Sequence, residues 1–340
     1  MVTSNIKKSE ENIIQKNWLR KFTERDDFII IVIFIIFTIL WFIISPTLRD
    51  INTLFDLLRE ISPYFLTVIG IGILMISGEF DLSVGSQLAL VNIITVTTFK
   101  FSENIWISIL AGVFSGLVIG AINAFWVNKL GLNSLVATLA MMFTLRGLVY
   151  VYTGRTSIIV NTKWPGAFKA LYYGSWAKIP IPFILTMVVL ILFYLILART
   201  SFGRNIYAIG GNSNAAIAAG INVKRTKMIL FIISSFLTSI SGLILTSQIL
   251  SGFFDLGSQG WELDAITACV LGGLILSGGE GSLTGAVIGM FILGITHKGL
   301  RLMGVYTTWM LVVNGVILII SLYTYRLRQS IFNSRRAISK

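Results

Sequence analysis

Long runs of apolar residues, separated by short polar or charged stretches, dominate the chain. None shows the alternation of apolar and polar residues that is typical of membrane barrel strands. A straight membrane-spanning helix needs about 20 apolar residues, and in lipid it satisfies its own backbone hydrogen bonds. The pattern therefore predicts an all-α polytopic membrane protein with about ten transmembrane helices. The runs are 28–46, 61–77, 82–99, 105–127, 135–152, 181–198, 228–250, 263–277, 282–297 and 305–325.

Composition and charge agree with a membrane protein and suggest its orientation. The chain is 55% hydrophobic and 12% charged, whereas about a quarter of the residues of a soluble domain are charged. Its net charge of +12 does not require a nucleic-acid partner, because most Lys and Arg lie between apolar runs. With the N-terminus inside, the cytoplasmic segments hold 17 Lys and Arg and the opposite side holds 9. This bias predicts that both termini are cytoplasmic.

The same pattern divides the chain into segments. We expect a cytoplasmic leader over 1–27, a transmembrane domain over 28–325 and a basic cytoplasmic tail over 326–340. Two longer connections interrupt the domain, an external loop over 153–180 and a cytoplasmic loop over 199–227. The first apolar run lacks a small-residue cleavage pattern and is interpreted as a retained anchor. The single cysteine, Cys269, excludes a disulfide within the chain.

Three short motifs recur in the same order, five crossings apart. Because five is odd, the two halves would lie in opposite orientations, and inverted repeats of this kind are typical of transporters, with the pathway at the repeat interface. We therefore predict two inverted five-helix repeats; chance similarity among small and aliphatic residues is the alternative. The pairs are Glu79-Phe80-Asp81 with Glu262-Leu263-Asp264, Ser115–Gly120 with Thr284–Gly289, and Leu130–Ser134 with Met303–Thr307.

Two sets of glycines lie four residues apart inside apolar runs. Gly112, Gly116 and Gly120 form one set, and Gly285 and Gly289 form the other. Residues at this spacing share a helix face, and glycine there lets two helix backbones approach closely in lipid. We interpret these positions as helix-packing sites.

Carboxylates lie at the edges of apolar runs. Asp81 directly precedes Leu82-Ser83-Val84 and is predicted to cap the helix that follows, and Asp264 is expected to do the same for the eighth run. Direct contact with a substrate is the alternative. None of these groups lies clearly in the middle of a run, which argues against a proton-driven carrier. The only histidine, His297, has no further metal-binding residues near it in sequence, so no metal site is predicted.

Catalytic motifs are missing, and the cytoplasmic loop contains the most distinctive local pattern. The sequence has no Ser/His/Asp arrangement, nucleotide-binding loop or HExxH motif, so any ATP would be bound by another chain. In the loop we expect Gly210-Gly211 to interrupt the chain, Asn212 to cap a short helix over 214–219, and Gly220 to end it. Such a helix suits docking to a cytoplasmic partner, and an ordinary connector is the alternative.

At these positions the sequence resembles a known family, the ABC-importer permeases for ribose, xylose and related monosaccharides. The stretch Gly78–Ser86 resembles the GxxDLSVGS signature of that family. The loop 203–221, the stretch from Glu262-Leu263-Asp264 to Gly273, and the run Ser277–Ser282 followed by Gly285 and Gly289 also resemble it. The resemblance covers roughly 28–325. Its signature residues here are Asp81, Ser83, Gly85, Glu262 and Asp264.

The resemblance implies a complete importer. Two permease chains, as a homodimer or heterodimer, would form the pathway in a bacterial cytoplasmic membrane. Two cytoplasmic ATPases would bind ATP and magnesium, and an external binding protein would deliver the sugar. This chain would be non-catalytic and hold no cofactor. The implied coupling residues are Gly203, Gly211, Asn212, Asn214, Ala215, Ala216, Gly220 and Ile221.

The sequence departs from the family pattern at two places, and other functions stay open. Asn214 stands where the EAAxxxG coupling motif has Glu, and Gly78-Glu79 replaces the more usual Gly-Gly. An ion-coupled secondary carrier with inverted repeats is the alternative function. An intramembrane enzyme is disfavoured, since no nucleophile–base or metal-ligand grouping exists. The substrate is left open among ribose, xylose, galactose-type sugars, inositol and a sugar-like signalling molecule.

Overall fold

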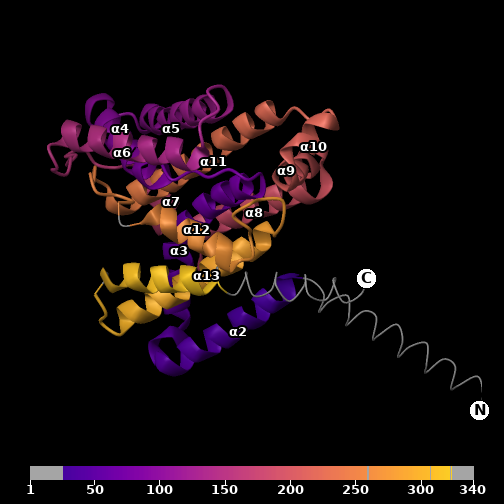
Figure 1. Ribbon diagram of the computed structural model, residues 1–340. Coiled ribbons are helices and arrows are strands. Elements are labelled where there is room, and N and C mark those ends of the chain that lie inside the picture. The colour runs from indigo at the N-terminus through magenta and orange to yellow at the C-terminus, as the bar shows by residue number, and fades with distance from the viewer. Residues whose placement is uncertain (1–25, 259, 307, 322, 324–340) are drawn as a thin grey trace, which may run out of the picture.

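The structure is a computed structural model in which residues 26–258, 260–306, 308–321 and 323 are described (Figure 1). The tail expected over 326–340 and all but the last two residues of the leader expected over 1–27 lie outside the described residues. The described part is mostly helical. It also contains a two-stranded antiparallel sheet, β1 (Ser175–Trp176) with β2 (Ile179–Pro180), and a single β-bridge between Ile158 and Gly252.

The helices follow the predicted apolar runs along the chain. In order they are α2 (Asp26–Ile44), the 3-10 turn η1 (Pro46–Arg49), α3 (Ile51–Ile76), α4 (Val84–Ser102), α5 (Ile105–Asn128), α6 (Ser134–Thr153), α7 (Gly166–Tyr173), α8 (Ile181–Arg199), α9 (Ser201–Gly211), α10 (Ser213–Ala218), α11 (Val223–Ile249), α12 (Trp261–Leu271) and α13 (Leu283–Leu302). A further apolar helical segment covers Thr308–Ser321.

Seven helices among the described residues are long and apolar enough to cross a membrane: α3, α4, α5, α6, α8, α11 and α13. The chain is therefore an all-α, multi-pass membrane protein. The apolar segments Ile30–Ile44 and Thr308–Ser321 are shorter, and α12 has only 11 residues. Since a helix rises about 1.5 Å per residue, α12 alone is about half as long as a bilayer core of roughly 30 Å. Ten crossings stay a prediction.

The eighth run differs most from its predicted extent. It was expected over 263–277, but the helix begins at Trp261 and ends at Leu271. Gly273 takes a positive φ of 85°, and the Leu274 amide donates to the Cys269 carbonyl at 2.9 Å, so the helix closes in a Schellman-type end. The apolar residues that follow extend the hydrophobic run without extending the helix.

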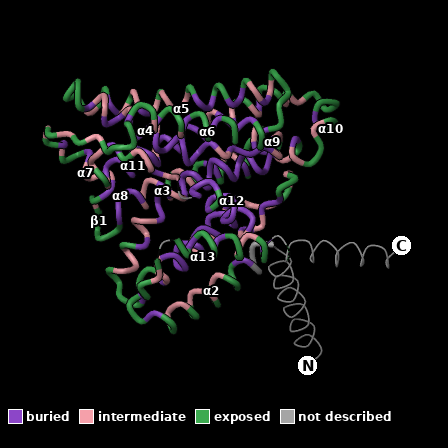
Figure 2. The backbone as a smooth tube through the Cα atoms, turned by 60° about the vertical axis from the view of Figure 1, so that its left-hand side comes forward, coloured by how far each residue is buried: buried purple, intermediate pink, exposed green. Residues whose placement is uncertain are grey.

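The centre of the molecule is formed by α3 and α11, which pack against each other. α11 also packs on α5 and α4, while α3 packs on α13 and α12. The most apolar window of α3 is 78% buried, whereas that of α8 is only 17% buried. Figure 2 shows buried backbone concentrated along the central helices and exposed backbone along α5 and α2. The outer helices therefore present the lipid-facing surface.

A proline lies inside the central helix α3 and removes a backbone donor there. Hydroxyl groups from neighbouring helices bond to carbonyls of this turn. Ser241 of α11 donates to the Pro63 carbonyl at 2.8 Å, and Thr186 of α8 donates to the Ser62 carbonyl at 3.2 Å. The carbonyl that loses its helical donor is that of Arg59, four residues before Pro63, so these bonds tie α11 and α8 to α3 rather than replace the missing one.

Helix α7 and the α9–α10 segment lie toward opposite ends of the bundle. Figure 2 shows α7 on the left and α10 on the right, and Figure 1 shows α9 and α10 together on the right. α7 belongs to the connection that was expected to be external, and α9–α10 belongs to the connection that was expected to be cytoplasmic. The fold thus separates these segments by the length of the membrane helices.

Candidate functional site

The α9–α10 segment is a compact, well-capped unit at one end of the molecule. The Asn212 side chain accepts from the Ala215 amide at 3.0 Å and so caps α10. At the other end Gly220 has φ of 81°, and the Ile221 amide donates to the Ala216 carbonyl at 3.0 Å. Both ends of this six-residue helix are therefore satisfied by local contacts.

The surface of α10 is small and exposed except for one anchoring residue. Ala216 is 3% exposed, whereas Ile217 is 59% exposed. Asn214, Ala215 and Gly220 are exposed as well. α10 packs mainly on α9 and more weakly on α11. The result is a protruding knob with an apolar tip, whose shape suits insertion into a groove of another protein.

The glycines of this segment differ from the expectation in where the helix is interrupted. Gly210-Gly211 was expected to break the chain, but α9 includes both glycines, and its C-cap is Asn212. Gly203 is buried where α9 leaves α8, and a Cβ there would collide with the backbone of Ile196 and Leu197. At Gly203 and Gly210 glycine therefore allows close approach of backbones rather than interrupting the helix, whereas a Cβ on Gly211 would meet nothing within 4 Å.

A cluster of glycine backbones joins α9 to two buried loops. A Cβ on Gly210 would overlap the Ile76 carbonyl oxygen and the Gly279 amide nitrogen. Gly279 itself donates to the Ile76 carbonyl at 2.8 Å, and a Cβ on Gly278 would lie 2.6 Å from the Gly78 nitrogen. The Tyr207 hydroxyl adds a bond to the Gly281 carbonyl at 3.0 Å. We call the contact of Gly78, Gly210, Gly278 and Gly279 the glycine junction.

Asp81 lies in a buried polar group between α3 and α4. Its carboxylate accepts from the Ser83 amide at 2.9 Å and from the Ser83 hydroxyl at 2.5 Å, and Asn123 of α5 donates to the same oxygen at 3.4 Å. The N-cap of α4 is Ser83 and not Asp81, and no side chain caps this helix; Asp81 lies two residues earlier and binds the amide of the N-cap residue. The bond from Asn123 also links Asp81 and the signature loop to α5, and the sequence around Asp81 did not predict that contact.

The structure brings Gly85 of the signature stretch against the start of α12. Gly85, in the first turn of α4, lies against Gly257, Trp261 and Glu262, and a Cβ on Gly85 would overlap the Glu262 Oε2 atom. Only a residue without a side chain allows this approach. Segments about 180 residues apart in sequence therefore meet at one point in the membrane.

The expected capping role of Asp264 is wrong. α12 begins three residues earlier, its N-cap is Gly260, and the Asp264 amide donates to the Gly260 carbonyl at 2.9 Å as part of the first helical turn. The Asp264 side chain is 6% exposed and instead accepts a hydrogen bond from Asn314. Its position one turn into the helix directs it toward the cavity described below.

The helix-packing glycines lie at close helix contacts. Cβ atoms on Gly116 and Gly120 would overlap Ser239 and Ser235 of α11, and one on Gly112 would overlap Thr95 of α4. In the second set, Gly285 and Gly289 lie against carbonyl oxygens of Gly272 and Ala268. The first set thus packs on α11 and α4, and the second on α12.

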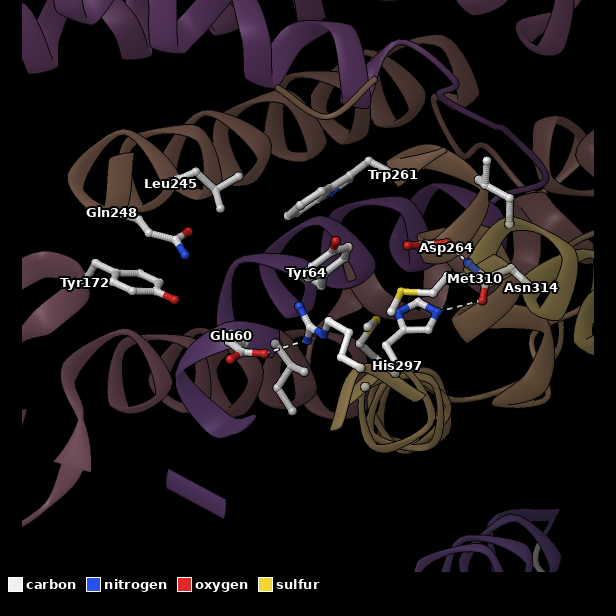
Figure 3. A pocket seen from close by; sticks show the side chains of 15 residues that line it. Glu60, Tyr64, Tyr172, Leu245, Gln248, Trp261, Asp264, His297, Met310 and Asn314 are labelled. Atoms are coloured by element: carbon white, nitrogen blue, oxygen red, sulfur yellow. Dashed lines mark hydrogen bonds and ion pairs between the residues drawn. The ribbon is translucent and has the colours of Figure 1, made fainter. Parts of the chain in front are cut away.

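A cavity of about 270 Å³ lies among α3, α7, α11, α12, α13 and the segment Thr308–Ser321. Tyr64 and Trp261 stack there with ring centroids 3.5 Å apart and planes at 11°. Figure 3 shows Tyr172 and Gln248 to one side of this pair and Asp264, Asn314 and His297 to the other. Asn314 joins the last three, because it donates to Asp264 and its oxygen lies 2.7 Å from His297 Nε2. The remaining lining residues are Glu60, Ile61, Leu245, Met290, Gly294, Arg301, Met310 and Leu311.

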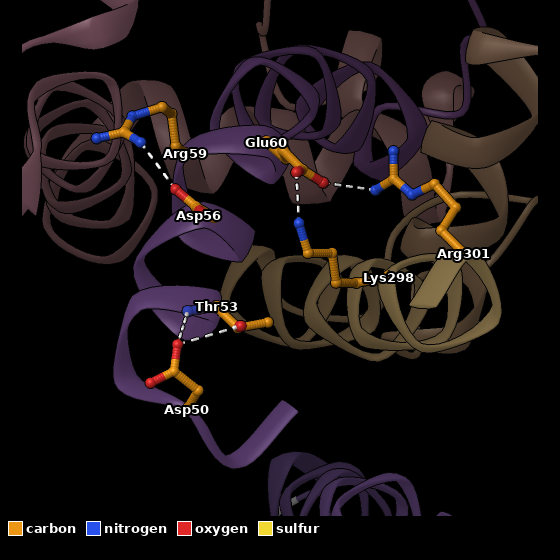
Figure 4. A network of polar contacts seen from close by, with 7 residues as sticks. All are labelled: Asp50, Thr53, Asp56, Arg59, Glu60, Lys298 and Arg301. Carbon is orange, nitrogen blue, oxygen red and sulfur yellow. Dashed lines mark hydrogen bonds and ion pairs between the residues drawn. The ribbon is translucent and has the colours of Figure 1, made fainter. Parts of the chain in front are cut away.

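An ion-pair network borders the cavity (Figure 4). Glu60 of α3 accepts from Lys298 at 2.6 Å and from Arg301 at 2.5 Å, and both partners belong to α13. Glu60 and Arg301 also line the cavity. Asp56 and Arg59 form a separate pair at 2.9 Å. The network therefore ties α3 to α13 beside the cavity, at the same end of the bundle as α7.

Sequence reasoning missed most of the cavity. Tyr64 and Trp261 are aromatic, and Asn314 carries an amide. Each lies inside or beside an apolar run, where ordinary helix packing also explains it. The nearest available signal was Asp264, for which substrate contact was the alternative. Among the described residues, no three His, Cys, Asp or Glu side chains are grouped so that they could hold a metal ion.

Comparisons with known proteins agree on a transport component. Residues 53–322 match the family described as "Branched-chain amino acid transport system / permease component". The chain is 36% identical to the L-arabinose transport system permease protein AraH of Escherichia coli K12 over 89% of this chain and 92% of that protein. It is 34% identical to the ribose import permease protein RbsC of Escherichia coli K12 over 82% and 87%. The Bacillus subtilis RbsC protein is also 34% identical, over 82% and 86%. No solved structure matches the chain.

Proposed function

We propose that this chain, which belongs to the family of ABC-importer permeases for monosaccharides, forms the transmembrane pathway for a sugar such as ribose or arabinose. The observation that carries the proposal is the match over most of the chain to sugar permeases at 34–36% identity. These relatives favour an ATP-driven importer over an ion-coupled carrier. The chain is a non-catalytic subunit, and ATP and magnesium are bound by a partner ATPase.

The α9–α10 segment is the coupling element in this proposal. Its exposed Ile217 tip and small-residue surface fit a groove on a cytoplasmic ATPase. The segment touches the buried loops through the glycine junction and the bond from Tyr207 to Gly281. If the ATPase displaces α10, the displacement is therefore passed to the C-terminal end of α3, at Ile76, and to the loop before α13. An external binding protein would deliver the sugar at the other end, where the 153–180 loop and α7 lie.

The topology of the importer follows the charge bias and the repeat. We infer ten crossings, with both termini in the cytoplasm of a bacterial cell and the chain in its cytoplasmic membrane. The inferred halves are inverted five-helix repeats. Helix packing supports this, since α11 packs on α5 in the way that α3 packs on α13, and α3 and α11 pack on each other. A second permease chain, in a homodimer or a heterodimer, completes the pathway.

Purification from the native membrane in mild detergent, with mass spectrometry of the associated chains, tests the assembly. We expect an ABC ATPase and an external binding protein to copurify. Reassembled in proteoliposomes, the complex should then take up a radiolabelled sugar only when ATP is present on the side of the membrane where the ATPase lies. Uptake that follows an ion gradient and ignores ATP would overturn the proposal.

Docking through α10 is tested with substitutions of its exposed face. Ile217→Arg places a charge at the apolar tip, and Gly220→Trp adds bulk where the helix ends. Both should abolish ATP-driven uptake while membrane insertion stays normal. Leu132→Arg is the matched control, because Leu132 is also an exposed apolar residue but lies between α5 and α6, outside the α9–α10 segment. Normal uptake by Ile217→Arg would remove the docking role.

A further inference from the structure

We propose that the cavity containing Tyr64, Trp261, Asp264 and Asn314 binds a single monosaccharide during its passage through this chain. The proposal rests on the proposed function and adds the place where the sugar is held. Four membrane helices or helical segments, together with α7 and α12, contribute lining residues. Relative movement of these elements would open or close the cavity, as a transport site requires.

The size of the cavity selects a small ligand. Its volume of about 270 Å³ lies just below the range of roughly 300–1,000 Å³ that holds drug-sized molecules. One sugar ring fits a space of this size. A disaccharide or a peptide does not.

The lining matches the two kinds of surface on a sugar. A monosaccharide has a C–H face that packs on aromatic rings and a rim of hydroxyl groups that need donors and acceptors. The Tyr64 and Trp261 rings cover each other's inner faces, so the aromatic surface that they offer is an outer face or an edge of the pair. Gln248 and Tyr172 lie on one side of it and Asp264 and Asn314 on the other (Figure 3). Amide and carboxylate groups at these edges can bond to hydroxyls in both roles, as donors and as acceptors.

The charges of the lining favour a neutral ligand. Glu60 and Asp264 are acidic, and Arg301 is basic. Glu60 is already paired with Lys298 and Arg301, so no strong excess of either sign faces the cavity. An inorganic ion or a highly charged metabolite would find no compensating cluster, whereas an uncharged polyol would need none.

The polar side of the cavity is held in place before a ligand arrives. Asn314 uses its amide nitrogen toward Asp264 and its oxygen toward His297, and all three residues are buried. A carboxylate accepts at about four lone-pair sites, so the bond from Asn314 leaves Asp264 capacity for a hydroxyl. Such preorganisation lowers the entropy cost of binding.

Substrate protection of an introduced cysteine tests binding directly. The chain has one native cysteine, Cys269, which is fully buried. In Gln248→Cys, prepared as the full complex without binding protein, a thiol reagent should label the cavity wall. L-arabinose or D-ribose at about ten times its dissociation constant should slow labelling roughly tenfold. Met303→Cys, exposed beyond the end of α13, is the control and should show no protection.

A second variant separates binding from coupling. Asp264→Asn keeps the shape of the side chain but replaces its carboxyl group, which accepts from Asn314, with an amide. With loaded binding protein it should keep stimulated ATP hydrolysis while the sugar moved per ATP falls by about tenfold. Asp56→Asn is the matched control, because Asp56 is exposed and does not line the cavity; both quantities should equal those of the wild type.

The outcomes distinguish this proposal from the proposed function. If the wild-type complex imports a sugar, but neither sugar protects Gln248→Cys and Asp264→Asn transports normally, the cavity is not a sugar site and the importer stands. Protection by L-leucine and not by the sugars would also overturn the cavity proposal. If the wild-type complex imports no sugar under ATP, the proposed function itself fails.

Discussion

At the scale of single residues, Gly210 and Gly211 are neighbours with opposite surroundings. A Cβ on Gly210 would overlap backbone atoms of Ile76 and Gly279, whereas among the described residues no atom lies within 4 Å of a Cβ on Gly211. Gly210→Ala should therefore lower the free energy of unfolding by about 1–3 kcal/mol. Gly211→Ala should leave it unchanged or raise it by less than about 1 kcal/mol. Thermal unfolding of both variants in detergent measures the difference, and equal melting temperatures would show that the junction can yield.

A second residue-scale prediction compares two ion pairs of different burial. Lys227 and Glu79 link the start of α11 to the signature loop, and their side chains are 17% and 11% exposed. Asp56 in the Arg59 pair is 55% exposed. Glu79→Gln should destabilise the protein by about 1–3 kcal/mol, because it leaves a largely buried ammonium without its partner. Asp56→Asn should cost less than about 1 kcal/mol. A reversed order in chemical denaturation would contradict the assignment of Glu79 as a structural partner.

Local chemistry was predictable from the sequence where one residue decides it. Asn212 as a cap and Gly220 as a helix end follow from intrinsic preferences, and both occupy those positions. Asp264 was misplaced, because its role depends on where α12 begins, and the N-cap of α12 is Gly260, two residues before the Glu262-Leu263-Asp264 motif. Gly210 was misread for a related reason. Its neighbours Ile76 and Gly279 are remote in sequence, so the need for close approach leaves no local signal.

At the scale of elements, α10 depends on its cap. A helix of six residues has little intrinsic stability. Asn212→Ala removes the bond to the Ala215 amide and should cost about 0.5–2 kcal/mol, which is enough to unfold α10 locally. Hydrogen exchange over 213–219 should accelerate about two- to thirtyfold, the equivalent of that free energy. Ser201→Ala, an exposed change on α9, should leave this exchange unchanged; unchanged exchange in Asn212→Ala itself would mean that packing on α9 alone holds the helix.

The two ends of a helix were predictable only where the apolar run and the helix cover the same residues. α5 and α8 match their runs within a few residues, since both have continuous apolar sequence with helix-compatible ends. The eighth run failed because Leu274 and Ile275 keep the sequence apolar after the backbone has turned at Gly273. Hydropathy indicates only that a stretch is buried in an apolar environment. Irregular backbone can be as apolar in sequence as a helix, provided that the surrounding protein buries it.

At the scale of the whole molecule, we predict that residues at the two ends of the bundle are labelled from opposite sides of the membrane. Trp176 in β1 is 74% exposed and Ile217 in α10 is 59% exposed, while the native Cys269 is buried. In intact cells, a membrane-impermeant maleimide should label Trp176→Cys and not Ile217→Cys. Permeabilised cells should show labelling of both. Labelling of Ile217→Cys from outside would contradict the cytoplasmic placement of α10 and with it the inferred orientation.

The arrangement of the whole molecule was the least accessible from sequence. The repeat and the charge bias indicate which ends of helices lie together, but the cavity needs the packing of α3 against α13 and of the segment Thr308–Ser321 beside α12. Glu60, Tyr172, Asp264 and Asn314 are separated by 50 residues or more along the chain. Their convergence follows from helix packing, which no single run encodes.

The glycine junction has a consequence for how the importer responds to its surroundings. The contact consists of peptide groups and carries no ionisable side chain of its own, so pH and ionic strength act on it only through neighbours such as the Glu79–Lys227 pair. It also has no rotamers to choose from. A shift of Gly210 must therefore shift Ile76 or Gly279 with it, because no side chain lies between their backbones.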